Sequence, residues 1–107
     1  MSYNKLVRDK IPDIIRSNGE EPITRILSEE EYKLELEKKL QEELNETLQA
    51  TGSDRIEELA DMLEVMTSLA ELEGKTLDDI IATRNKKKEE RGGFQNRLYL
   101  SGVKEDK

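Results

Sequence analysis

The chain contains neither cysteine nor histidine. Without cysteine it can form no disulfide and no thiolate metal site, and without histidine it can build no histidine-dependent catalytic triad. Any catalysis must therefore rely on carboxylates, lysines, arginines and hydroxyls. The metal ion best suited to such a chain is a hard cation that prefers oxygen ligands.

Long apolar runs are missing as well. No stretch approaches the roughly 20 apolar residues that a membrane-spanning helix needs, and the first residues lack the apolar core of a signal peptide. We therefore expect a cytoplasmic protein with no membrane partner.

Aromatic residues are scarce, at 4% of the 107 residues, whereas 40% are charged and 34% are hydrophobic. A chain of this length predicts a single domain over residues 1–107 with a modest core of Leu and Ile. Helical chains with such cores often complete them by pairing with a copy of themselves, so we expect a homodimer or homotetramer. The net charge of −7 argues against nucleic acid as a partner and favours a divalent cation, or a ligand that carries one.

Capping and stop signals divide the chain into four helices. Ser28 with Glu31, and Thr76 with Asp79, each form the sequence pattern of a capping box. The predicted helices cover residues 8–19, 28–50, 53–73 (with Ser53 or Asp54 as N-cap) and 76–91. Two short segments, 22–27 and 94–100, read as strands that could pair in a small β-ribbon. The predicted fold is thus mainly all-α, with two long antiparallel helices joined by a tight turn.

The third predicted helix interrupts its own hydrophobic pattern. Glu57, Glu64, Ser68 and Glu71 share one polar stripe, and apolar residues cover most of the remaining circumference. Glu58 lies off this stripe, among apolar residues, and Asp61 lies on the adjacent edge. An ionised carboxylate in such a place must be paired, protonated or bound to a metal. A buried ion pair between Glu58 and a lysine is the structural alternative to a metal site.

The second predicted helix carries carboxylates that could face Glu58 and Asp61 of the third. Leu36, Leu40, Leu44 and Leu48 recur every fourth residue and predict the inward face, with Glu43 on its margin and Glu46 and Glu42 further round the same side. Two carboxylate pairs spaced three residues apart on antiparallel neighbours can converge. Four carboxylates would repel one another unless a cation neutralised them, and Mg²⁺ fits an all-oxygen site, with Mn²⁺ as a substitute. Solvated glutamates on two ordinary helices remain the alternative, most of all for Glu42 and Glu57.

These residues also resemble a known family. The segments KLQEELNE (39–46) and EELADML (57–63) are similar to the EExxE…ExxD pattern of the MazG-like all-α nucleoside triphosphate pyrophosphohydrolases. The opening YNKLVRDKIPDII (3–15) and the late ERGGF (90–94) look like a small subgroup described as house-cleaning pyrophosphatases. The resemblance extends from Tyr3 to about Leu100.

The resemblance implies hydrolysis of the α–β phosphoanhydride of a nucleoside triphosphate, non-canonical nucleotides included, to a monophosphate and pyrophosphate. It implies that Mg²⁺ is held by Glu43, Glu46, Glu58 and Asp61. Glu42 would orient the attacking water or take its proton, and Lys39 would face a phosphate. The chain is shorter than larger family members, which leaves the base specificity open and suggests that part of the pocket comes from another subunit.

Basic residues elsewhere are further candidates for substrate binding. Asn85, Lys88 and Arg91 fall roughly on one face of the last predicted helix, and Phe94 could cover a nucleobase or join the core. Lys5 and Arg8 could contact phosphates near the N-terminus. A solubilising basic helix end and surface pairing with the many glutamates are the plainer alternatives.

Two other functions stay open. The segment EELADML…GKTLDDII (57–81) is also similar to phosphoribosyl-ATP pyrophosphohydrolase, which would change the substrate within the same class. A non-enzymatic helical interaction module would explain the glutamate-rich helices and an oligomer, but it would not explain Glu58 within an apolar surface. The chain also lacks the sustained heptad pattern of a coiled coil.

Overall fold

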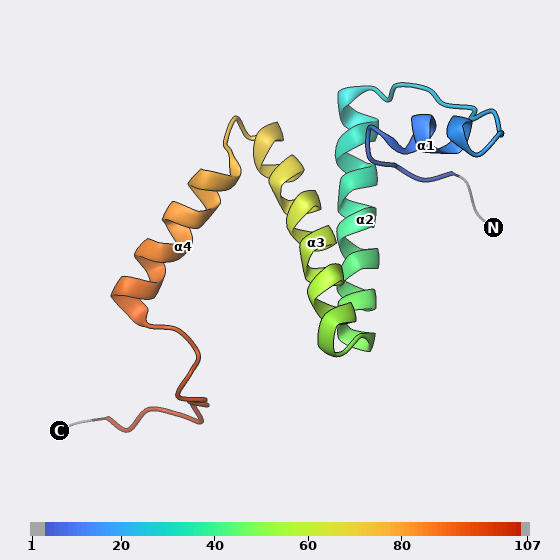
Figure 1. Cartoon of the computed structure of the whole chain (residues 1–107). Helices are drawn as coiled ribbons and strands as arrows, with labels where there is room; N and C mark the ends of the chain where they lie inside the picture. The colour runs from blue at the N-terminus through green and yellow to red at the C-terminus, as the bar shows by residue number, and fades with distance from the viewer. Residues whose placement is uncertain (1–3, 106–107) are drawn as a thin grey trace.

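The computed structural model describes residues 4–105 and contains four α-helices in that range (Figure 1). Their bounds are α1 Ile11–Ser17, α2 Glu29–Gln49, α3 Gly52–Leu72 and α4 Leu77–Arg91. Helices α2 and α3 run antiparallel, side by side, and form a hairpin, whereas α4 leads away from it. Among the described residues no helix is long and apolar enough to cross a membrane. The all-α prediction is confirmed.

Both predicted capping boxes are present. The Ser28 hydroxyl accepts from the Glu31 backbone N–H, and the Glu31 carboxylate accepts from the Ser28 N–H, each at 3.2 Å. Thr76 and Asp79 make the same reciprocal pair at 3.3 and 2.8 Å. Each box supplies partners for backbone donors that a helix start leaves unpaired.

The turn between α2 and α3 is tighter than predicted. Thr51, rather than Ser53 or Asp54, is the N-cap of α3, so only Ala50 and Thr51 separate the two helices. Gly52 makes this possible with a φ of +59°, which is costly for residues that carry a Cβ. The Arg55 side chain closes the turn by donating to the Ala50 carbonyl oxygen at 2.8 Å.

The buried face of α2 differs from the predicted leucine stripe. Leu36 is buried, but Leu44 and Leu48 are 40% and 67% exposed. Residues four apart advance about 400° around the helix, so a stripe at that spacing drifts by about 40° per step away from the partner helix. Glu43 and Thr47 are buried in their place, against an α3 face that includes the buried Val65.

The predicted β-ribbon is not formed, since residues 4–105 contain no β-strand. Segments 22–27 and 94–100 are both irregular, and Ile23, Ile26 and Phe94 are almost fully exposed. The two segments lie at opposite ends of the molecule, because α4 carries the second one away from α2 (Figure 1). The alternating apolar residues of these two segments therefore have no neighbouring strand with which to pair.

Candidate metal centre between α2 and α3

Three of the four predicted metal ligands converge where α2 meets α3. Each of Glu43, Glu58 and Asp61 places a carboxylate oxygen within 4.8 Å of the other two. The antiparallel pairing of the helices brings Glu43 of one opposite Glu58 of the other, and Asp61 follows one helical turn later. The expected convergence of the two carboxylate pairs is therefore present for these three residues.

Glu43 is the most deeply placed of the cluster. Its residue exposure is 7%, and its Oε2 is buried without a hydrogen-bond partner, as is the Oε2 of Glu58. An unpaired carboxylate oxygen in such a position is costly, which is why buried polar atoms are nearly always paired. The two orphaned oxygens point to a positively charged or hydrogen-donating ligand.

The fourth predicted ligand, Glu46, lies beside the cluster. It is exposed, but it is near enough to Glu58 for a shared hydrogen bond that is the largest cause raising the pKa of Glu58. Burial and the neighbouring Glu43 add to this effect, and together they bring the pKa of Glu58 to about 7. The pKa of Glu43 is also raised, first by its burial and then by the charges of Glu46 and Asp61.

Hydrogen bonding between carboxyls raises the pKa of Glu58, and burial and repulsion between neighbouring carboxylates favour the protonated form of both residues and so raise both pKa values. Protonated carboxyls relieve the repulsion, and so does a cation. Lys39 offsets part of it, because its charge acts to lower the pKa of Glu43. The alternative to a metal site, an ion pair between Glu58 and a lysine, is not formed among the described residues.

Arg8 approaches the cluster from the N-terminal segment. Its Nη2 donates to Oδ1 of Asp61 at 2.8 Å, and both side chains are about half exposed. Arg8 was predicted as a phosphate contact, but here it neutralises a predicted metal ligand. Nothing in the sequence indicated this pairing, since the two residues are 53 positions apart.

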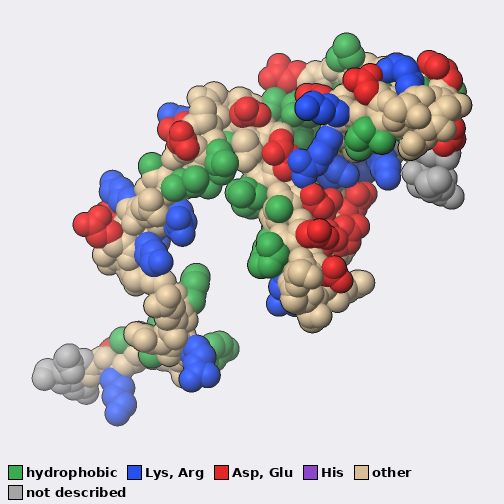
Figure 2. All heavy atoms as spheres, in the orientation of Figure 1, with side chains coloured by type: hydrophobic (Ala, Val, Ile, Leu, Met, Phe, Trp, Pro, Cys, Tyr) green, Lys and Arg blue, Asp and Glu red, His purple; other side chains and the backbone are tan. Residues whose placement is uncertain are grey.

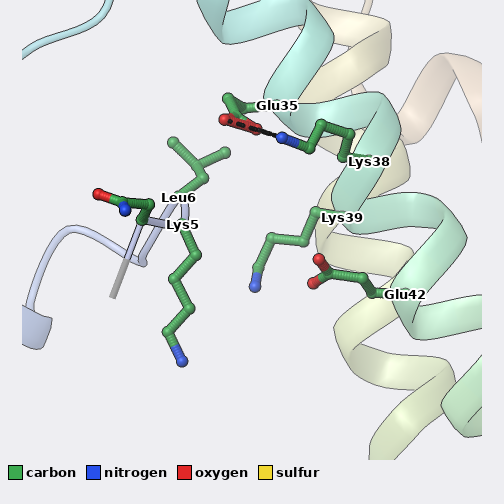
Figure 3. Close-up of a pocket in the computed structure, with 7 residues that line it drawn as sticks. Lys5, Leu6, Glu35, Lys38, Lys39 and Glu42 are labelled. Atoms are coloured by element: carbon green, nitrogen blue, oxygen red, sulfur yellow. Dashed lines mark hydrogen bonds and ion pairs between the residues drawn. The ribbon is translucent and has the colours of Figure 1, made fainter. Parts of the chain in front are cut away.

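A small pocket opens next to the cluster, between the N-terminal segment and α2. Its volume is about 90 Å³, and Figure 3 shows Lys5, Lys39 and Glu42 pointing into it. Lys38 turns instead to Glu35, with Nζ and Oε2 3.1 Å apart. The pocket thus combines three of the predicted side chains, two cationic and one acidic.

This pocket is too small for a nucleotide. Sites for small organic molecules usually measure about 300 Å³ or more, and about 90 Å³ holds roughly three waters at ~30 Å³ each. The pocket is of a size for a single phosphate-like group. A larger ligand would need walls that this one chain does not place here.

The remaining predicted residues lie far from the cluster. Asn85, Lys88 and Arg91 are on α4, and Phe94 follows that helix with 97% of its surface exposed. Figure 1 shows α4 pointing away from the hairpin that carries the acidic residues. The structure therefore does not bring this group to the candidate metal centre within one chain.

The donor set fits a hard divalent cation. All three converging groups are carboxylates, the oxygen ligands that Mg²⁺ prefers, and their oxygens lie within 4.8 Å of one another. Glu46 lies on the adjacent turn of α2 and is not among the three carboxylates whose oxygens converge. Three or four carboxylates leave the remaining positions of an octahedral ion to waters or ligand phosphates.

Comparison with known proteins finds a relative that matches part of the chain. An uncharacterized protein of Mycolicibacterium smegmatis is 46% identical over 50 residues, which are 47% of this chain and 51% of that protein. The chain thus spans about half the length of this relative. No protein-family model and no solved structure matches the chain.

Proposed function

We propose that this protein is a Mg²⁺-dependent nucleoside triphosphate pyrophosphohydrolase of the MazG-like class, acting on non-canonical nucleotides in the cytoplasm. The observation that carries the proposal is the convergence of Glu43, Glu58 and Asp61 around two buried, unpartnered carboxylate oxygens. The EELNE…EELAD pattern that contains these residues gives the reaction class by resemblance.

Glu43, Glu58 and Asp61 would hold Mg²⁺, with Glu46 as the fourth carboxylate, and Mn²⁺ could substitute. The ion would supply charge neutralisation for the triphosphate and a lowered pKa for water. A cluster of carboxylates alone would repel a triphosphate, so the cation also determines whether the substrate can approach at all.

We propose that lysines of the chain itself contact the phosphates. Lys39 and Lys5 line the small pocket beside the cluster, where each ammonium group could pair with a phosphate oxygen. Because the pocket is of phosphate size, we propose that it receives one phosphate group while the nucleoside extends outwards.

We propose Glu42 as the group that accepts the proton of the attacking water. It lines the same pocket and is exposed, so it can accept a proton from an attacking water. As the water oxygen bonds to a phosphorus of the α–β anhydride, the bond from that phosphorus to the bridging oxygen breaks. The bridging oxygen keeps the bonding electrons, Glu42 takes the proton, and monophosphate and pyrophosphate separate.

We also propose that the active form is a homodimer or homotetramer. Within the described chain only Leu36 and Val65 are buried hydrophobic residues, which is a thin core for 102 residues. The limited pocket volume supports the same view, because a second subunit could supply the missing walls.

Pyrophosphate release from a panel of canonical and modified nucleoside triphosphates, and from phosphoribosyl-ATP, tests this function. We expect Mg²⁺-dependent release that Glu58→Gln abolishes and that Glu57→Gln preserves. Glu57 is the matched control, because it neighbours Glu58 in α3 but is exposed. Absence of release from every substrate would contradict the proposal and favour an interaction module.

A further inference from the structure

Arg8 forms the ion pair that joins the N-terminal segment, residues 4–10, to the candidate metal centre. Its Nη2 donates to Oδ1 of Asp61 at 2.8 Å. None of the other ion pairs among residues 4–105 involves a carboxylate of the cluster. Figure 2 shows one face of the molecule on which Lys and Arg side chains gather beside a group of acidic side chains on the α2–α3 hairpin. The guanidinium of Arg8 therefore supplies positive charge where the centre needs a cation.

This pair leaves the cluster only partly neutralised. Glu43, which is 7% exposed, turns its carboxylate towards Glu58 and Asp61, and its Oε2 has no hydrogen-bond partner. The Oε2 of Glu58 has none either. A guanidinium is a planar group that acts through the N–H groups at its edge, and this one reaches Asp61 alone. A divalent cation is compact enough to contact all three carboxylates at once, so it would satisfy the oxygens that Arg8 leaves unpaired.

The Arg8–Asp61 pair is of a kind that a metal ion displaces readily. The two side chains are 55% and 46% exposed, and ion pairs in such positions contribute little to stability because water and salt screen them. Arg8 lies in a stretch without regular secondary structure, so a change in its side-chain rotamer disturbs no helix. A divalent cation bound at Asp61 would also repel the guanidinium that now touches the same carboxylate.

The pocket beside the cluster offers the released guanidinium a new partner. Lys5 and Leu6 line this pocket, and they precede Arg8 by three and two residues in the same segment. Figure 3 shows Lys5 and Lys39 pointing into the pocket, whose volume of about 90 Å³ is of a size for one phosphate group. Each lysine acts as a point charge, whereas a guanidinium forms paired hydrogen bonds with two phosphate oxygens. Arg8 would therefore add a bidentate contact to the two lysines.

We propose that Arg8 exchanges partners when the metal binds: its guanidinium leaves Asp61 and binds a phosphate group in the pocket lined by Lys5 and Lys39. The exchange couples the two ligands, because metal binding frees a residue that the phosphate needs. It also favours the metal as the first ligand, since Asp61 holds Arg8 until then. This exchange rests on the metal site of the proposed function and is independent of the hydrolysis.

The first measurement follows the Arg8 side chain itself by NMR of ¹⁵N-labelled protein. The side-chain ¹H–¹⁵N signals of a guanidinium differ between an ion-paired and a free arginine, and those of Arg8 are identified by their absence in Arg8→Lys. We expect an ion-paired Arg8 in EDTA and a free one after Mg²⁺ is added. Arg25 is the internal control, because it pairs with Glu31 at the start of α2 at 3.2 and 2.9 Å, and its signals should not change. Arg8 signals that stay the same while Mg²⁺ binds would overturn the exchange.

Binding isotherms measure the competition for Asp61. Arg8→Gln should bind Mg²⁺ roughly two- to fivefold more tightly, because the metal no longer has to break an exposed ion pair. Arg25→Gln is the matched control, since it removes the same charge and also an ion pair, and it should leave the Mg²⁺ affinity unchanged. Weaker Mg²⁺ binding by Arg8→Gln would mean that Arg8 holds Asp61 in place for the metal, and it would overturn the exchange.

Inorganic phosphate is the probe for the second half of the exchange. In Mg²⁺, Arg8→Gln should weaken phosphate binding about tenfold, because a charge-assisted contact is lost. In EDTA the same variant should change phosphate binding less than about twofold, because Asp61 already holds the guanidinium. Lys5→Gln should weaken phosphate binding in both conditions. Equal effects of Arg8→Gln with and without Mg²⁺ would overturn the exchange.

The outcomes also separate the exchange from the proposed function. A protein that binds no Mg²⁺ would overturn both. An Arg8 that stays on Asp61 in Mg²⁺-bound protein would overturn the exchange alone. Release of Arg8 by Mg²⁺ in a protein that cleaves no nucleotide would support the exchange and overturn the hydrolysis alone.

Discussion

The raised pKa of Glu58 should make the proposed metal binding depend on pH. The pKa of Glu58 is raised to about 7 by Glu46, burial and Glu43, so this carboxyl is largely protonated at pH 6 and largely ionised at pH 8. A cation needs the ionised form, and binding must expel the proton. With a pKa of about 7, Mg²⁺ should bind about tenfold more weakly at pH 6 than at pH 8.

Calorimetry in buffers of different ionisation enthalpy counts the released protons. We expect about 0.9 proton per Mg²⁺ at pH 6, about 0.5 at pH 7 and about 0.1 at pH 8, from the titration of a single group. Glu57→Gln should give the same three values. Proton release that is zero at all three pH values, or affinity that is unchanged between pH 6 and 8, would refute the reasoning.

Three further predictions concern the protein without added metal. The pKa of Glu58 in the folded chain exceeds its ordinary value of 4.5, so between about pH 4.5 and 7 the unfolded chain binds fewer protons than the folded chain. Thermal stability in EDTA should therefore fall as the pH rises through this range. Glu58→Gln should flatten this fall, and an unchanged slope in Glu58→Gln would contradict the prediction. Ser28→Ala removes the capping box of α2 and should cost about 1 kcal/mol in urea unfolding, whereas a loss below ~0.3 kcal/mol would show that the cap is redundant. In Gly52→Ala the alanine must adopt the positive φ of the tight turn, which should lower the free energy of unfolding by about 1–2 kcal/mol. No loss of stability in the same unfolding assay would contradict this prediction.

The helix ends were predictable from the sequence because local chemistry determines them. Ser28 with Glu31 and Thr76 with Asp79 cap their helices through residues three positions apart. Such contacts need no tertiary partner. The start of α3 was predicted wrongly, since Gly52 takes a left-handed conformation and lets the helix begin earlier than Ser53.

The candidate site was partly predictable. Glu58 and Asp61 stood out because they interrupt an apolar surface, and their approach to Glu43 followed from an antiparallel helix pair. The ion pair of Arg8 with Asp61 was not predictable, because it depends on the path of an irregular segment. The same holds for α4, whose direction depends on the short connection after α3.

The carboxylates of α2 and α3 are proposed to form a metal centre for α–β phosphoanhydride cleavage. The most direct measurement is ³¹P NMR of nucleoside triphosphates incubated with the protein, with and without Mg²⁺. We predict monophosphate and pyrophosphate in equal amounts, formed only with Mg²⁺, absent in Glu58→Gln and retained in Glu57→Gln. Intact triphosphates, or a diphosphate with orthophosphate, would contradict it.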